Sequence, residues 1–107
     1  MLVVSGGSGR VVHAVAAALA ALPGNKRLGL LKAGAGAGFP AAFALQYAPL
    51  TSPQDRLRLM EGATDLLLVP SFDQRAIEHE MSLAATARAA GIQRIHLLSA
   101  AGADARS

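Results

Sequence analysis

The first loop of the chain carries the residues whose types and spacing best suit chemistry on a phosphate. It reads Ser5-Gly6-Gly7-Ser8-Gly9-Arg10 and follows a short apolar run at the N-terminus. Glycines let a backbone turn tightly and approach a pyrophosphate without a Cβ in the way. A helix that follows would present free N–H groups and the positive end of its dipole, and Ser8 adds a hydroxyl. The alternative is a strand-to-helix turn without a ligand, and the lack of a Gly-Lys-Ser/Thr ending excludes a P-loop.

The remaining polar residues do not form a recognisable catalytic or metal-binding set. The histidines, His13, His79 and His96, are distributed over two predicted helices and one strand, without the spacing of metal ligands. They are interpreted as surface or core residues. The chain has no cysteine, which excludes disulfides, thiolate chemistry and zinc held by cysteines.

Composition limits the classes of protein and partner. A chain of 107 residues with 52% hydrophobic residues predicts one folded domain, residues 1–107. The net charge of +3 suits an anionic cofactor, but no Lys/Arg cluster is interleaved with aromatic residues, so we expect no nucleic-acid partner. The apolar run Val11–Leu22 is shorter than the ~20 residues that span a bilayer. No positive charge precedes that run as in a secretion signal. We therefore expect a cytoplasmic protein without a membrane partner.

Strand-like and helix-like segments alternate along the chain. The predicted strands are Leu2–Val4, Arg27–Leu31, Phe43–Tyr47, Asp65–Val69 and Arg94–Leu98. The predicted helices are Arg10–Leu22, Pro53–Glu61 and Ala76–Ala90, and the segment Ala33–Gly38 is a predicted loop. This alternation predicts an α/β fold, a doubly wound, Rossmann-like parallel sheet of about five strands in the order 3-2-1-4-5, with helices on both faces. Ligands bind such sheets at the carboxyl ends of the strands, where the strand order reverses, and the first loop belongs there.

Local signals define two of the helices. Ser52 is predicted to cap the second helix, with Pro53 at its first position and Asp55 as a reciprocal capping carboxylate. Gly62 and Gly91 suit the C-terminal ends of the second and third helices. The third helix has apolar residues at helical spacing, which predicts one buried face formed by Ile77, Met81 and Ala84.

The whole chain resembles the NmrA-like atypical short-chain dehydrogenases. The first loop of that family reads Thr-Gly-Ala-Thr-Gly-x-x-Gly, to which Ser5–Val12 is similar. The segment Glu61–Pro70 resembles the family's approach to its fourth strand, and Ala87–Asp104 resembles its last helix, fifth strand and strand-end loop. The resemblance implies an NAD(P)-binding Rossmann half, from a group whose complete members transfer hydride or sense the redox state of the cofactor.

The resemblance also implies where the cofactor binds. The implied cofactor-binding residues are Gly6, Gly7, Ser8, Gly9, Arg10, Val11, Lys32, Val69, Pro70 and Ser71. In this family a basic residue at the place of Lys32 pairs with the 2′-phosphate of NADP, and Arg10 could reach the same phosphate. NADP(H) is therefore expected over NAD(H), the alternative being that both side chains are solvated surface charges. The segment Val69–Ser71 would pass the ribose and nicotinamide, and a plain strand exit is the alternative.

Several residues depart from the family pattern. Val12 stands where the third glycine is expected, which would push the helix slightly outward, and Pro49 stands where the family has an aspartate near the adenine. The only tyrosine is Tyr47, so the Tyr-x-x-x-Lys pair is absent, and Ser99 has no base to activate it. No catalytic residue is assigned for these reasons.

Three functions stay open at this point. The first is cofactor binding or redox sensing, the second is NADPH-dependent reduction of quinones or similar small carbonyl compounds, and the third is a degenerate fragment without a ligand. The sequence ends soon after the fifth predicted strand, so the substrate-binding part of the family is expected to be lacking. We expect that strand to be an open sheet edge, which a homodimer or a partner protein would cover.

Overall fold

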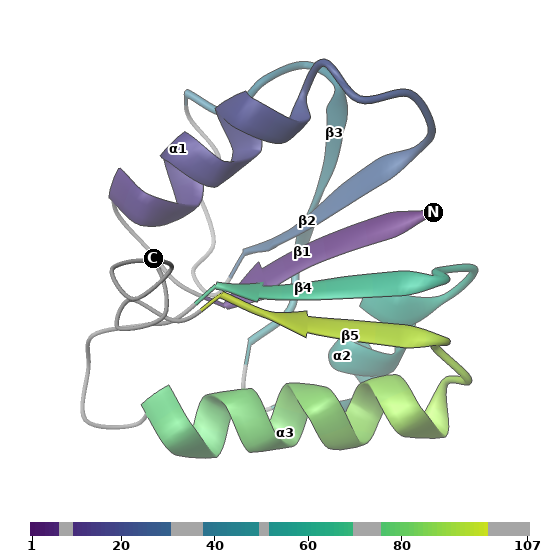
Figure 1. Ribbon diagram of the computed structural model, residues 1–107. Helices are drawn as coiled ribbons and strands as arrows, with labels where there is room; N and C mark the ends of the chain where they lie inside the picture. Colours follow the sequence, from purple (N-terminus) through teal and green to yellow (C-terminus); the bar gives the residue numbers. More distant parts are fainter. Residues whose placement is uncertain (7–9, 31–37, 50–51, 70–75, 99–107) are drawn as a thin grey trace, which may run out of the picture.

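The architecture is a single parallel sheet with helices on both faces. The computed structural model describes residues 1–6, 10–30, 38–49, 52–69 and 76–98. The strands β1 (Leu2–Gly6), β2 (Lys26–Leu30), β3 (Phe43–Tyr47), β4 (Asp65–Val69) and β5 (Arg94–Leu97) are arranged in the order β3-β2-β1-β4-β5 (Figure 1). All four strand pairings are parallel. The predicted fold class and strand order are therefore confirmed.

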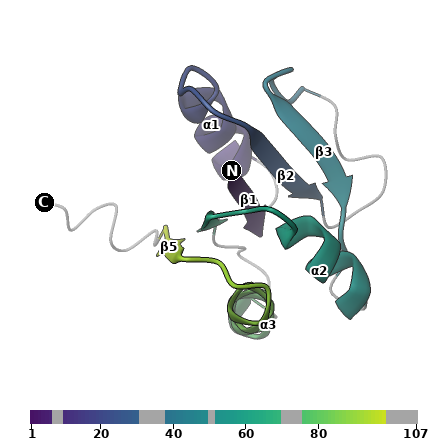
Figure 2. The ribbon, with the colours of Figure 1, turned by 90° about the vertical axis from the view of Figure 1, so that its right-hand side faces the viewer.

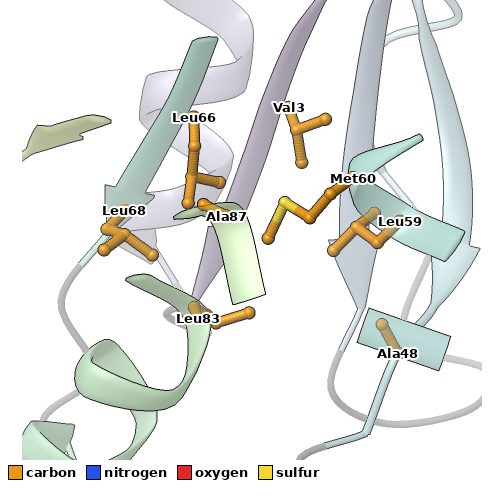
Figure 3. Close-up of a cluster of buried hydrophobic side chains, with 8 residues drawn as sticks. All are labelled: Val3, Ala48, Leu59, Met60, Leu66, Leu68, Leu83 and Ala87. Atoms are coloured by element: carbon orange, nitrogen blue, oxygen red, sulfur yellow. The ribbon is translucent and has the colours of Figure 1, made fainter. Parts of the chain in front are cut away.

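The helices cover the sheet from opposite sides. The helix α1 (Arg10–Leu19) packs on one face, and α2 (Pro53–Met60) and α3 (Ala76–Ala89) pack on the other (Figure 2). Successive side chains of a strand point to opposite faces, so Val3 and Val4 of β1 belong to different apolar clusters. The cluster under α2 and α3 contains Val3, Ala48, Leu59, Met60, Leu66, Leu68, Leu83 and Ala87 (Figure 3). The cluster under α1 contains Val4, Val12, Ala16, Leu28, Phe43 and Val69.

The capping prediction for α2 is confirmed in its main part. The Ser52 hydroxyl oxygen accepts a hydrogen bond from the Asp55 amide at 3.3 Å, and Pro53 occupies the first position of the helix. The reciprocal contact is replaced by two others. The Ser52 amide donates to the Pro49 carbonyl at 3.1 Å, and the Asp55 carboxylate pairs with Arg58 at 3.2 Å. Arg58 lies three residues further along the helix, where the two side chains are neighbours.

The buried face predicted for α3 is wrong at Met81, whose residue is 67% exposed. Leu83 and Ala87, four residues apart, face the sheet instead, and Ala84 is partly buried against the same cluster. The side chain of Ile77 lies outside the described part of the structure. An Ala-rich helix offers several sets of apolar residues at helical spacing. A shift of two positions turns the face by roughly 200°, so the pattern alone does not select the buried set.

The first helix ends earlier than predicted, at Leu19 rather than Leu22. The Leu22 amide donates to the Leu19 carbonyl in a turn, and Gly24 follows with a left-handed φ of 98°. The ammonium group of Lys26, which is buried, donates to the carbonyls of Leu22 and Gly24. This lysine therefore closes the turn between α1 and β2, and β2 begins at Lys26, one residue earlier than predicted.

The strand β5 forms one edge of the sheet and pairs with β4. All four of its residues are exposed, with Ile95 at 37% and Leu97 at 59%. The Leu98 amide still donates to the Leu68 carbonyl at 3.0 Å, so the pairing runs one residue beyond the strand. The described residues thus contain the open edge that the sequence predicts.

Candidate functional site

The carboxyl ends of β1 and β4 bring two predicted site residues together. Gly6 is the last residue of β1, and its partner in the parallel register is Val69, the last residue of β4. The chain runs from β1 to β2 on one side, whereas β4 lies on the other side of β1. The strand order therefore reverses between β1 and β4, which is the place where parallel α/β sheets bind ligands.

The helix α1 begins at this same edge of the sheet. Its first residue is Arg10, separated from Gly6 by the predicted loop residues Gly7, Ser8 and Gly9, which lie outside the described part. The start of α1 lies on the side toward which the arrowheads of β1 and β4 point (Figure 1). The first four amides of a helix have no partner within it, so these groups are available to an anion.

Apolar packing holds the first turn of α1 against the sheet. Val11 is partly buried, and Val12 is 4% exposed within the cluster under α1. The position where the family has a third glycine is thus a packed core position here. The outward displacement predicted for Val12 stays a prediction, and the role of Val11 in binding also stays a prediction.

The remaining predicted site residues follow strand ends at this edge. Lys32 comes two residues after Leu30, which ends β2, and Pro70 and Ser71 follow Val69 directly. These residues lie outside the described part, as does the side chain of Arg10. Their roles remain predictions. The strand ends that precede them in the sequence lie at the carboxyl edge of the sheet.

Sequence reasoning missed a stacked pair of rings beside α1. The imidazole of His13 and the phenyl ring of Phe39 are 4.0 Å apart between centroids, with 6° between their planes. Both residues are half-buried, and Phe39 packs against the cluster under α1. His13 therefore takes part in an aromatic contact. No local pattern indicates this pairing, because Phe39 belongs to the connection between β2 and β3.

Two hollows lie at the opposite, amino-terminal edge of the sheet. One has a volume of about 450 Å³ and lies beside Lys26, Arg27 and Phe43; the other, of about 280 Å³, lies beside Met1 and Asp65. The cations beside the first hollow, Lys26 and Arg27, already donate hydrogen bonds to backbone carbonyls. The Arg27 guanidinium donates to three carbonyls at the end of α2, those of Arg58, Leu59 and Glu61, at 3.2, 2.6 and 3.1 Å. This edge is thus distinct from the candidate phosphate site.

A charged cluster ties β5 to β4 at that amino-terminal edge. The Asp65 carboxylate accepts hydrogen bonds from Arg94 Nε at 2.8 Å and Thr64 Oγ1 at 2.8 Å, and His96 Nε2 is 3.2 Å away. Arg94, then Thr64 and His96, hold the pKa of the Asp65 carboxyl well below its usual range. Among the described residues no group of three His, Cys, Asp or Glu side chains could hold a metal ion.

The fold and the position of this site define the class of the domain as Rossmann-like α/β. No known protein family and no curated protein matches the sequence. Two solved structures share the fold at 16% identity. A "putative epimerase" from Bacteroides thetaiotaomicron has a TM-score of 0.63 over 90% of this chain and 45% of its own. A "putative exported protein" from Burkholderia pseudomallei has a TM-score of 0.68 over 95% of this chain and 49% of its own.

The chain thus spans about half the length of the two solved structures that it matches. At this identity the likeness concerns the fold. Separately, no helix within the described ranges is long and apolar enough to cross a membrane.

Proposed function

We propose that this chain binds a nicotinamide dinucleotide at the carboxyl ends of β1 and β4, as the Rossmann half of an NmrA-like protein. One observation carries the proposal. Gly6 and Val69 lie side by side where the strand order reverses, and α1 begins at Arg10, after three further residues. A glycine-rich turn that leads from a first strand into a helix at this point is the arrangement that receives a pyrophosphate.

The residues at this edge suit the parts of a dinucleotide. In the proposal, Gly6, which lies beside the end of β4 and has no Cβ, lets the pyrophosphate approach the backbone closely. In the proposal, the loop residues Gly7, Ser8 and Gly9 and the first amides of α1 hold the pyrophosphate. The apolar Val69, followed by Pro70 and Ser71, borders the ribose and nicotinamide. Val69, Pro70 and Ser71 have no ionised side chain that would interact with the phosphates.

The preferred cofactor in this proposal is NADP(H). Lys32 follows the end of β2 in the sequence and Arg10 is the first residue of α1, and in the proposal these two cations serve the 2′-phosphate. A phosphate on the adenosine ribose would pair with these cations, whereas the free hydroxyl of NAD(H) gains no ionic contact. In the proposal, the preference for NADP(H) over NAD(H) depends on these two positive charges, whereas binding of the pyrophosphate does not.

Binding, rather than catalysis, is the proposed activity of residues 1–107. A bound nicotinamide would supply hydride transfer, and the protein would supply position and electrostatics. The Tyr-x-x-x-Lys pair is absent from the sequence. We propose that this chain is one Rossmann unit and that a second copy or a partner protein covers β5, whose Ile95 and Leu97 are exposed. The epimerase description belongs to the Bacteroides protein, and we carry over from it the Rossmann half alone.

A titration and a turnover assay together test the proposal. The fluorescence of NADPH or NADH is followed as protein is added, with adenosine alone as the control for binding of the base. We expect saturable binding of both dinucleotides and weaker binding of adenosine. Oxidation of NADPH is then followed with a panel of quinones and small carbonyl compounds. Binding without oxidation supports a binding or sensing protein, oxidation supports the reductase alternative, and the absence of binding refutes the proposal.

A further inference from the structure

The edge strand β5 presents a free row of backbone groups on its outer side. The amides of Arg94 and Leu98 donate toward β4, at 3.1 and 3.0 Å. The N–H and C=O groups of successive residues point to alternate sides of a strand, so those of Ile95 and Leu97 point outward. Within the described residues no strand lies beyond β5 (Figure 2). Ile95 and Leu97 therefore offer their backbone donors and acceptors to a further strand.

The side chains of the same two residues continue an apolar face of the sheet. Ile95 is the register partner of Leu66, and Leu97 is the register partner of Leu68. The two β4 residues are buried in the cluster under α2 and α3, whereas Ile95 and Leu97 are exposed. Two rows of apolar side chains thus run from the core to the edge and end there uncovered. A strand that pairs with β5 has to bring apolar side chains to that face.

The charges at this edge favour an identical chain over a charged partner. Arg94 Nε and the Asp65 carboxylate form an ion pair at 2.8 Å, and His96 Nε2 is 3.2 Å from the same carboxylate. Side chains alternate along a strand, so these groups lie on the face opposite to Ile95. The edge therefore presents compensated charges in a chain whose net charge is +3. Two copies meet here without the repulsion of uncompensated like charges, and an acidic or basic partner gains no ionic contact.

We propose that a second copy of this chain pairs with β5 in the antiparallel direction, around a twofold axis at His96. This inference rests on the part of the proposed function in which β5 is covered, and not on dinucleotide binding. The axis places Ile95 opposite Leu97 of the partner subunit, and Leu97 opposite Ile95 of the partner subunit. Each outward N–H then meets an outward C=O, and the two sheets join into one with α3 of both copies on the same face.

The apolar rows select this register among the symmetric ones. With the axis at His96, both exposed apolar residues of β5 lie opposite apolar residues, and each row continues into a row of the partner. An axis at Ile95 would instead set Leu97 opposite the polar Gln93 of the partner subunit. An axis at Leu97 would set Ile95 opposite a position beyond the end of β5. The register at His96 therefore uses the whole edge.

Single cysteines test the register, since the chain has no cysteine of its own. At the axis the two copies of residue 96 form a non-hydrogen-bonded pair with Cα atoms ~4.5 Å apart, which a disulfide can bridge. We expect His96→Cys to form a covalent dimer on mild oxidation. The two copies of Leu97→Cys are displaced by two residues, ~7 Å along the strand, in addition to the spacing of the strands. Leu97→Cys, and Met81→Cys on the exposed side of α3, are therefore expected to stay largely uncrosslinked.

Light scattering at micromolar protein measures the mass of the full chain and its edge variants. We expect the parent to have twice the mass of one chain. Ile95→Pro removes an outward N–H that does not bond β4, a place where an edge strand accepts proline, and Leu97→Lys puts a charge into an apolar row. Each is expected to lower the mass to that of one chain. Leu57→Lys changes an exposed leucine of α2 and keeps the parent mass. Circular dichroism confirms that each variant is folded.

Several results would overturn this inference. They are a monomeric parent, an assembly larger than a dimer, a dimer that persists in both edge variants, and cross-linking that is stronger at Leu97→Cys than at His96→Cys. Titration of NADPH and NADH on the same samples decides the proposed binding separately. A monomer that binds dinucleotide overturns the inference alone, whereas a cross-linked dimer that binds neither dinucleotide refutes the proposed binding alone.

Discussion

Gly29 lies in β2 at a point where the sheet approaches α2 too closely for a side chain. A Cβ at this position would be 2.5 Å from Leu59 Cδ2, 3.4 Å from Leu59 Cδ1 and 3.0 Å from the hydroxyl oxygen of Ser5. Leu59 is completely buried and Ser5 is 2% exposed, so neither side chain has solvent into which it can move. Ser5 also immediately precedes Gly6 of the candidate site. Gly29→Ala is therefore expected to disturb both the core and the end of β1.

The magnitude follows from two opposing effects. The φ of Gly29 is not in the left-handed region, so alanine fits the backbone and would stabilise by ~0.4–1 kcal/mol through the unfolded chain. Forcing a methyl group into a packed core costs ~1–3 kcal/mol. The net expectation is a destabilisation of about 1–2 kcal/mol. For a domain of this size it corresponds to a fall in Tm of roughly 5–15 °C.

Thermal and urea unfolding, followed by circular dichroism, measure this change in a double-mutant cycle with Leu59→Ala. The Leu59→Ala variant alone loses ~2–5 kcal/mol because it leaves a cavity. In that background the methyl group of Gly29→Ala enters the vacated space, so the second substitution becomes neutral or stabilising. The expected coupling is at least about 1 kcal/mol. Gly29→Ala that leaves Tm unchanged, or costs the same in both backgrounds, would refute the close packing of β2 against α2.

Four further predictions concern the site, the charges and the sheet edge. Gly9→Val abolishes dinucleotide binding in a fluorescence titration and leaves the circular dichroism spectrum unchanged, since its side chain occupies the space of the pyrophosphate; parent-like binding would exclude this loop. Lys32→Glu removes or reverses an NADPH preference of about ten- to a hundredfold, and equal affinities in the parent would contradict the assignment. The pKa of the Asp65 carboxyl is lowered first by Arg94, so its contribution to stability is complete above the unfolded pKa near ~3.9 and is lost as pH falls below it. Asp65→Asn therefore flattens the acid limb of Tm against pH, and an unchanged limb would argue against the cluster. Leu97→Lys places a charge on the exposed strand β5 and lowers the apparent mass in light scattering at micromolar protein, whereas a monomeric parent would remove the need for a cover on that edge.

The elements with strong local signals could be predicted from the sequence. The bounds of β3 and β4 agree with the prediction, and α2 begins at Pro53 after the Ser52 cap. Continuous apolar runs fix buried strands, and a capping hydroxyl fixes a helix start, since both depend on neighbours in the chain. The order of the strands followed from the alternation of strands and helices together with right-handed crossovers.

Contacts between residues that are distant in the sequence could not be predicted in the same way. The His13–Phe39 stack and the Arg27 contacts to the end of α2 join residues that are distant in the sequence. Each depends on how the elements pack, which periodicity does not specify. The exposed Met81 shows the same limit, because an Ala-rich helix has no single apolar stripe. The sequence predicted which residues form the candidate site. The structure adds that two of them, Gly6 and Val69, lie side by side.

The distribution of positive charge limits which cations can explain the proposed preference for NADP(H). A net charge of +3 suggests at first that the whole chain attracts an anionic cofactor. The structure assigns several of these cations to other tasks: Lys26 and Arg27 bind carbonyls at the amino-terminal edge of the sheet, and Arg94 is paired with Asp65 at that same edge. Phosphate recognition at the opposite edge therefore cannot rest on overall charge. In the proposal, this recognition rests on Arg10 and Lys32, which begin α1 and follow β2 in the sequence.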